Sequence, residues 1–200
     1  AINGPATACQ GSAGIIYSTE TGMTNYSWTI SSGGTITSGN GTSSIVVSWF
    51  MPGSQSVSVS YTNGNGCTAG TPTSLGVTVN PLPGNAGSIT GNMAVCDGSA
   101  GIPYSVSPIT NATSYSWSLP SGATIASGAG TGSITVNFTA GASSGNIIVY
   151  GMNSCGSGNP SPALPVTLYT MPGTADSIAG PAVVCAGTSG AIYNVAPVSN

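Results

Sequence analysis

The chain has 200 residues, yet only Glu20, Asp97 and Asp176 are charged, and Lys, Arg and His are absent. An average soluble chain of this length would carry roughly fifty charges. Without Lys or Arg there is no basic surface for nucleic acid or anionic lipid, and without His no Ser-His-Asp or Cys-His catalytic group can form. We therefore predict a protein that is not an enzyme, has no cofactor and binds no nucleic acid.

Hydrophobic residues make up 40% of the chain, which is enough to form a core. No run of about 18 apolar residues appears, so we predict no membrane insertion. The low net charge of −3 and the ample supply of Val, Ile, Tyr and Trp do not fit the composition of a disordered chain.

Along the chain, the first motif to appear is one that occurs three times. Residues 9–17, 96–104 and 185–193 share the pattern Cys-x-Gly-Ser/Thr-x-Gly-x-x-Tyr. Their cysteines lie 87 and 89 residues apart. Downstream, Tyr-Ser-Trp at 26–28 recurs at 115–117, and Asn-Gly-Cys at 65–67 matches Asn-Ser-Cys at 153–155. A period of about 88 residues is typical of a string of domains rather than of a solenoid.

Pro- and Gly-rich segments mark the boundaries between these repeats, at residues 81–84 and 171–173. We therefore predict a first domain at 1–82, which lacks its first few residues, and a second at 83–171. Residues 172–200 then form the start of a third, truncated repeat.

Within each repeat, apolar and polar residues alternate over short stretches. Tyr26, Trp28 and Ile30 show this period of two, and the same alternation recurs at 45–49, 57–61, 115–119 and 134–138. Gly- and Ser-rich turns separate the stretches, and no helical periodicity is present. About seven short strands, with a Trp placed between two distant cysteines, predict an all-β fold of tandem immunoglobulin-like sandwiches.

Four of the five cysteines recur at the same two places in each repeat, which favours the bonds Cys9–Cys67 and Cys96–Cys155. The rival bond, Cys67–Cys96, would join the repeats across the linker. Cys185 is expected to have its partner outside this segment. Each pairing places the chain in an oxidising, extracellular compartment.

These motifs, together with Leu-Pro-Ser-Gly-Ala-Thr-Ile at 119–125 and Leu-Pro-Val-Thr at 164–167, resemble the PKD-like repeats of Bacteroidota cell-surface proteins. The resemblance implies immunoglobulin-like sandwiches in a tandem array at the cell surface. It also implies export, commonly by the type IX secretion route, and roles in adhesion, gliding or surface filaments. Repeats of this family are usually spacers rather than enzymes.

Two kinds of candidate site follow. Ser177, in Asp-Ser-Ile, resembles the O-glycosylation motif of related bacteria. Phe50, Ile148 and Tyr150 are apolar residues in outward positions, where the other repeat has Thr139, Ser60 and Thr62, and they predict a contact surface.

The leading hypothesis is a non-catalytic stalk or filament segment of a surface or secreted protein. Its partners would be neighbouring repeats of the same chain and identical chains in a filament, because a surface without charge repulsion favours packing. The alternative is a glycan-binding module, in which Tyr150 would act with Asn146 and Asn153 on surface glycans.

Overall fold

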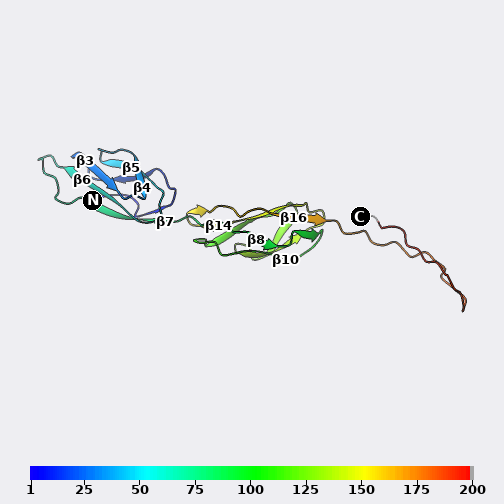
Figure 1. The fold of residues 1–200 in the computed structure, drawn as a ribbon. Helices are drawn as coiled ribbons and strands as arrows, with labels where there is room; N and C mark the ends of the chain where they lie inside the picture. The colour runs from blue at the N-terminus through cyan, green and yellow to red at the C-terminus, as the bar shows by residue number, and fades with distance from the viewer. Residues whose placement is uncertain (199–200) are drawn as a thin grey trace. The chain divides into compact units, whose positions relative to one another are not determined.

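A computed structural model describes residues 1–198 and shows an all-β protein with two β-sandwiches (Figure 1). This confirms the predicted fold class. Among the residues described there is no helix with the length and apolarity needed to cross a bilayer.

The first sandwich has a four-stranded sheet in the order β1-β7-β6-β3 and a three-stranded sheet in the order β2-β5-β4. Its strands are β1 (Thr7–Cys9), β2 (Ile15–Ser18), β3 (Thr24–Ile30), β4 (Gly34–Ser38), β5 (Ser44–Trp49), β6 (Gly53–Thr62) and β7 (Thr73–Asn80).

The second sandwich repeats this plan with the sheets β12-β13-β10-β8 and β11-β14-β16-β9, and β15 pairs with β14. Its strands are β8 (Ile89–Gly91), β9 (Ala94–Cys96), β10 (Ile102–Val106), β11 (Ser114–Ser118), β12 (Ala123–Ser127), β13 (Ser133–Phe138), β14 (Gly145–Asn153), β15 (Gly156–Ser157) and β16 (Leu164–Tyr169).

In each sandwich one of the long-range strand pairings is parallel. β1 runs parallel to β7 with Cys9 opposite Asn80, and β9 runs parallel to β16 with Cys96 opposite Tyr169. The other ladders given for the two sandwiches are antiparallel, as expected for hairpins and Greek-key connections. This parallel pair decides where the cysteines lie.

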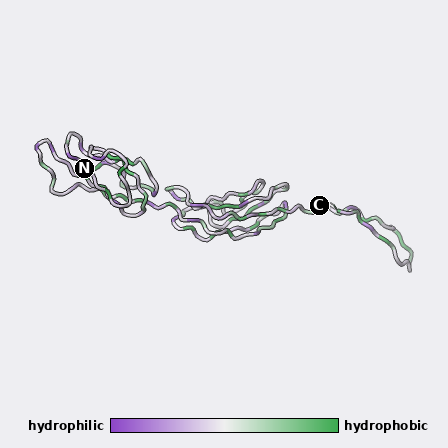
Figure 2. Tube along the Cα trace, turned by 45° about the horizontal axis from the view of Figure 1, so that its top comes forward, coloured by the Kyte–Doolittle hydropathy of each residue, from purple (hydrophilic) through white to green (hydrophobic). Residues whose placement is uncertain are grey.

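The core follows the alternation seen in the sequence. Along β5, Ile45, Val47 and Trp49 are buried while the residues between them are partly exposed. Figure 2 shows hydrophobic and hydrophilic stretches alternating along the chain. Trp49 lies edge-on to the ring of Tyr17 and donates its indole N–H to the tyrosine hydroxyl at 3.2 Å. In the second sandwich Phe138 takes the place of Trp49, and Trp117 is only partly buried.

The start of the third repeat repeats one contact of the first. Ala179 and Asn194 exchange two backbone hydrogen bonds of 2.8 Å, as Asn3 and Ser18 do at 2.8 and 2.9 Å. No strand is assigned between residues 172 and 198.

By its contacts the chain divides into two compact units. The first comprises residues 1–87, 107–116 and 150–161, and the second comprises residues 88–106, 117–149 and the described residues from 162 onward. The first unit therefore includes the linker at 81–84 and two loops that follow it in the sequence.

Candidate functional site

A disulfide closes the first unit between Cys9 and Cys155, whose Cα atoms lie 5.4 Å apart. This corrects the predicted pairing. The bonds Cys9–Cys67, Cys96–Cys155 and Cys67–Cys96 are all missing from the described chain, in which Cys67, Cys96 and Cys185 are exposed free thiols.

The direction of the strands explains the difference. Cys9 lies opposite Asn80 at the far end of β7, whereas Cys67 lies in the turn that precedes the start of β7 at Thr73. A strand of that length separates its two ends by about 20 Å or more. A disulfide tolerates a Cα–Cα distance of about 4.4–6.8 Å, so the two cysteines of one repeat cannot bond.

Asn153 organises the junction around the disulfide. Its side-chain Nδ2 donates to the carbonyl oxygens of Pro81 at 2.9 Å and Asn111 at 3.0 Å. Its Oδ1 accepts the backbone N–H of Cys155 at 2.8 Å. One side chain thus ties the linker, a loop and the cysteine-bearing turn together. The glycan-binding role predicted for Asn153 beside Tyr150 stays a prediction.

Backbone contacts complete the junction. The N–H of Leu82 donates to Gln10 Oε1 at 3.3 Å, and that of Gly84 donates to the carbonyl of Thr110 at 2.8 Å. Gly158 lies so close to the linker that a Cβ there would come within 2.6 Å of the Gly84 oxygen. A shallow pocket of about 330 Å³ beside it is lined by Gln10, Leu82, Pro83, Gly84, Asn85, Ser157, Gly158 and Asn159.

Two of the three acidic residues, Asp97 and Glu20, hold local structure together. Both carboxylate oxygens of Asp97 accept the backbone N–H of Gly141 at 3.0 Å. The Glu20 carboxylate accepts a hydrogen bond from the Tyr61 hydroxyl, and this bond holds the pKa of Glu20 below its usual value. The ion pair of Glu20 with the terminal ammonium of Ala1, at 3.1 Å, lowers the same pKa further. Asp176 is exposed. In the part of the chain that the structure describes, no three Cys, Asp or Glu side chains gather into a group that could hold a metal ion.

The predicted contact residues lie in different settings. Phe50 is 49% exposed, and its N–H donates to Gly33 as that of Thr139 donates to Gly122. Ile148 and Tyr150 are partly buried.

The strand registers change the predicted match between the repeats by two residues. Gln55 pairs with Val77, and Gly145 pairs with Val166. Ile148 therefore takes the position of Ser58, and Tyr150 that of Ser60. Both counterparts are still polar, so the contact surface stays a prediction. Ser177 is exposed, and its glycosylation also stays a prediction.

Sequence reasoning missed the junction. The sequence gives Asn153 only a place in the Asn-Ser-Cys match and a predicted glycan contact, and it gives Gln10 no predicted role. The signal that could have found the junction is the position of the cysteines relative to strand ends. In the first two repeats the Cys-x-Gly motif begins at the last residue of a short strand, β1 or β9, and the Asn-x-Cys motif lies at or just after the end of the longest strand, β6 or β14.

Solved structures show the fold class of the chain. A marsupial T cell receptor is similar at 11% identity with a TM-score of 0.53, over 92% of this chain and 77% of that one. Titin domains A168–A170 are similar at 11% identity with a TM-score of 0.47, over 84% of this chain. The chain covers 66% of that titin structure, just under two thirds of its length. At this identity, the likeness to the T cell receptor shows an immunoglobulin-like fold alone.

Among curated proteins, none matches the chain significantly. The family profile described as "PKD-like domain" matches residues 1–77 and again residues 82–166. Tandem domains of this kind are typical of structural or binding modules in extracellular proteins and are generally non-catalytic. With two matches that together span most of its length, the chain belongs to the PKD-like domain family.

Proposed function

We propose that this chain is a non-catalytic structural segment of an extracellular protein, a stalk or filament building block used in surface adhesion, gliding or fibre assembly. The Cys9–Cys155 disulfide is the observation that carries the proposal. It joins a cysteine of the first PKD-like match to a cysteine of the second. A bond of this kind persists in an oxidising space. Tension on the chain then passes through the disulfide and bypasses the strands that the bond encloses.

The mechanical consequence follows from the position of the bond. The two cysteines are 146 residues apart in sequence. When the ends of the chain are pulled, the bond carries the load, and the enclosed residues cannot extend. At about 3.6 Å per extended residue, the enclosed segment hides roughly 500 Å of contour length.

Single-molecule force spectroscopy of the chain measures this directly. We expect the oxidised chain to release almost no length up to forces that unfold ordinary domains. The reduced chain and the Cys9→Ser variant should each release about 500 Å more. Equal extension with and without reductant would remove the support for a load-bearing role.

The cellular side of the proposal has its own test. An antibody raised against residues 1–200, used for immunogold electron microscopy of source cells, should label the cell surface or fibres that extend from it. Gold confined to the cell interior would overturn the extracellular assignment.

The low charge of the chain favours close packing of such segments. With three acidic residues and no basic ones, neighbouring chains repel one another weakly. Phe50 is the apolar residue that we propose for contact between copies. Replacing it by Thr, the residue of the second repeat, should weaken self-association in sedimentation velocity. Ile16→Thr, which removes an apolar side chain that is 60% exposed, is the matched control.

A further inference from the structure

Three cysteines share one backbone setting, and we call Cys9, Cys96 and Cys185 the first-strand cysteines. The carbonyl of each accepts an N–H from the residue three positions later, at 3.0, 3.2 and 3.0 Å respectively. For Cys9 and Cys96 the likeness extends further. The N–H of the following residue donates at 2.8 Å to the last residue of the closing strand, Asn80 or Tyr169. Cys96 therefore occupies at the end of β16 the place that Cys9 occupies at the end of β7.

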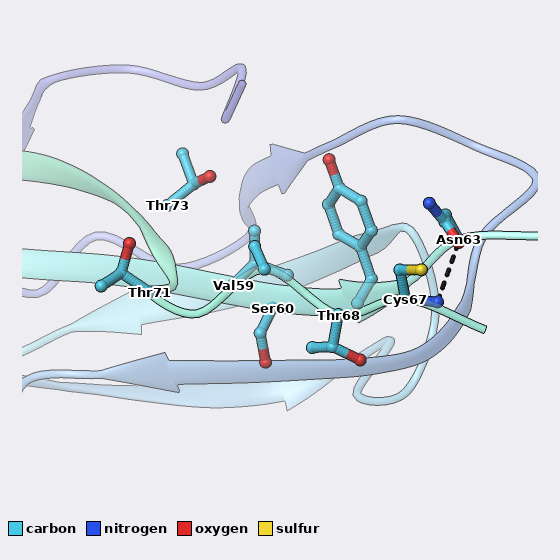
Figure 3. A pocket seen from close by; sticks show the side chains of 9 residues that line it. Val59, Ser60, Asn63, Cys67, Thr68, Thr71 and Thr73 are labelled. Carbon is cyan, nitrogen blue, oxygen red and sulfur yellow. Dashed lines mark hydrogen bonds between the residues drawn. The ribbon is translucent and has the colours of Figure 1, made fainter. Parts of the chain in front are cut away.

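The other two cysteines share a second setting, and we call Cys67 and Cys155 the hairpin cysteines. The N–H of each donates to the Oδ1 of an asparagine at the end of the preceding long strand. Asn63 accepts from Cys67, four residues later, at 3.0 Å, and Asn153 accepts from Cys155, two residues later, at 2.8 Å. In the first repeat the N–H two residues after the asparagine is that of Asn65, and it donates to the same Asn63 oxygen at 3.0 Å. Figure 3 shows the Cys67 side chain and its hydrogen bond to Asn63.

The bonded and free members of each pair differ in their surroundings. Cys9 and Cys155 are partly buried, whereas Cys67 and Cys96 are exposed. Cys155 lies beside the linker, which Asn153 holds through Pro81. Cys67 lies instead on an open pocket of about 330 Å³ whose lining is mostly hydroxyl side chains, including Thr68, Thr71 and Thr73 (Figure 3).

We propose that Cys96 and Cys67 each form a disulfide with a cysteine of a neighbouring repeat, of the same kind as the bond between Cys9 and Cys155. Cys96 bonds to the hairpin cysteine of a repeat that follows, and Cys67 bonds to the first-strand cysteine of a repeat that precedes. The neighbouring repeat lies either in the same chain or in another copy of it. These bonds are inferred from the placement of Cys9 and Cys155 in their repeats, and they go beyond the proposed function.

The chemistry is thiol–disulfide exchange with a low-molecular-weight or enzyme-bound disulfide as oxidant. The two cysteine thiols lose two protons and two electrons and form one S–S bond. The oxidant's S–S bond breaks and takes them up as two thiols.

An array built in this way has overlapping covalent loops. The Cys9–Cys155 loop encloses residues 10–154, and a loop closed from Cys96 begins at residue 97. A single backbone cut inside the array then leaves both fragments attached. No linker would be the weakest point of the array.

Cyanogen bromide suits the mapping, because the chain has no Lys or Arg for trypsin and its five methionines separate all five cysteines. Cleavage after Met23, Met51, Met93, Met152 and Met171 places Cys9, Cys67, Cys96, Cys155 and Cys185 in different fragments. Mass spectrometry of the unreduced fragments from the oxidised native protein then identifies each bonded pair.

In the native protein, we expect fragment 1–23 bonded to fragment 153–171. Fragment 52–93 should carry a peptide with the Cys-x-Gly-x-x-Gly motif, and fragment 94–152 a peptide with the Asn-x-Cys motif. If 52–93 and 94–152 are bonded to each other in a disulfide-linked multimer, the neighbouring repeat is in another copy, which also supports the proposal. The same bond in a monomer, or free thiols at both positions, would overturn it.

The 200-residue chain by itself supplies a second measurement. After oxidation with glutathione at high dilution, a maleimide should label three thiols per chain, those of Cys67, Cys96 and Cys185. The Cys96→Ser and Cys67→Ser variants should each label two and keep the 1–23 to 153–171 bond. One labelled thiol in the unmutated chain would show bonds within repeats and contradict the proposal.

Discussion

At the scale of single residues, a tyrosine packed on a glycine marks the beginning of every repeat. A Cβ added to Gly4, Gly91 or Gly180 would come within 2.1 to 2.3 Å of the ring of Tyr17, Tyr104 or Tyr193 respectively. The hydroxyl of each tyrosine donates to the backbone carbonyl of the residue directly after that glycine. In each repeat, a glycine that precedes the Cys-x-Gly-Ser/Thr-x-Gly-x-x-Tyr motif therefore contacts the tyrosine that ends it.

Gly91→Ala tests this contact. The new methyl group would push the Tyr104 ring into a packed core, so we expect a loss of about 1–3 kcal/mol in unfolding free energy. Gly87→Ala is the matched control, because nothing lies within 4 Å of its added Cβ. Chemical denaturation of the two variants checks the prediction, and equal stabilities would contradict it.

Tyr17 and Tyr104 also predict how stability depends on alkaline pH. Burial raises the pKa of both hydroxyls, although the Trp49 hydrogen bond partly offsets this for Tyr17. A raised pKa means that the folded state holds its proton more tightly than the unfolded state does. The stabilisation is therefore fully present below the ordinary pKa of about 10, and it is lost as the pH rises through the folded-state value.

Thermal unfolding of thiol-alkylated protein between pH 8 and 11 measures that loss, which should be smaller in Tyr104→Phe. At neutral pH, Tyr17→Phe should cost more than Tyr104→Phe. It leaves the buried Trp49 N–H without its acceptor, at about 1–3 kcal/mol, whereas Tyr104→Phe frees only the carbonyl of Asn92. A pH profile unchanged by Tyr104→Phe would contradict the assignment.

At the scale of the strand, the alternation in the sequence corresponds directly to burial. Successive residues of a strand point to opposite faces, so the period of two could be read without the fold. Along β14, Ile147 is fully buried and its neighbour Ile148 is not. The registers were less predictable, as the two-residue change in the match of Ile148 and Tyr150 shows, because pairing depends on turns and on the partner strand.

Ile147→Ala and Ile148→Ala separate the two faces of β14. The first leaves a cavity in the core and should cost about 2–5 kcal/mol, and the second should cost only a fraction of that. Urea unfolding gives both values. A cost for Ile148→Ala as large as that for Ile147→Ala would mean that its outer face is packed as tightly as the core.

At the scale of the whole molecule, the low charge predicts a response to acid. The three carboxylates are the only charged side chains in the sequence, so acid can only reduce the negative charge of the chain. We expect self-association of thiol-alkylated chain to rise between pH 7 and pH 3.5, with little effect of salt, because weak repulsion is removed and no ion pair is formed. Sedimentation velocity at several pH values would reveal it, and association that falls in acid would exclude packing limited by repulsion.

The all-β class, the tandem repeats and the outward position of Phe50 follow from the sequence alone. Those properties rest on local alternation, on turn residues and on a period that repeats along the chain. Only the tertiary structure decided which cysteines bond. The parallel pairing of β1 with β7 carries Cys9 to the end of the repeat where the linker begins, while Cys67 stays at the opposite end. A disulfide forms where two Cα atoms come within a few ångströms, and that distance depends on the direction of a strand rather than on the spacing of residues.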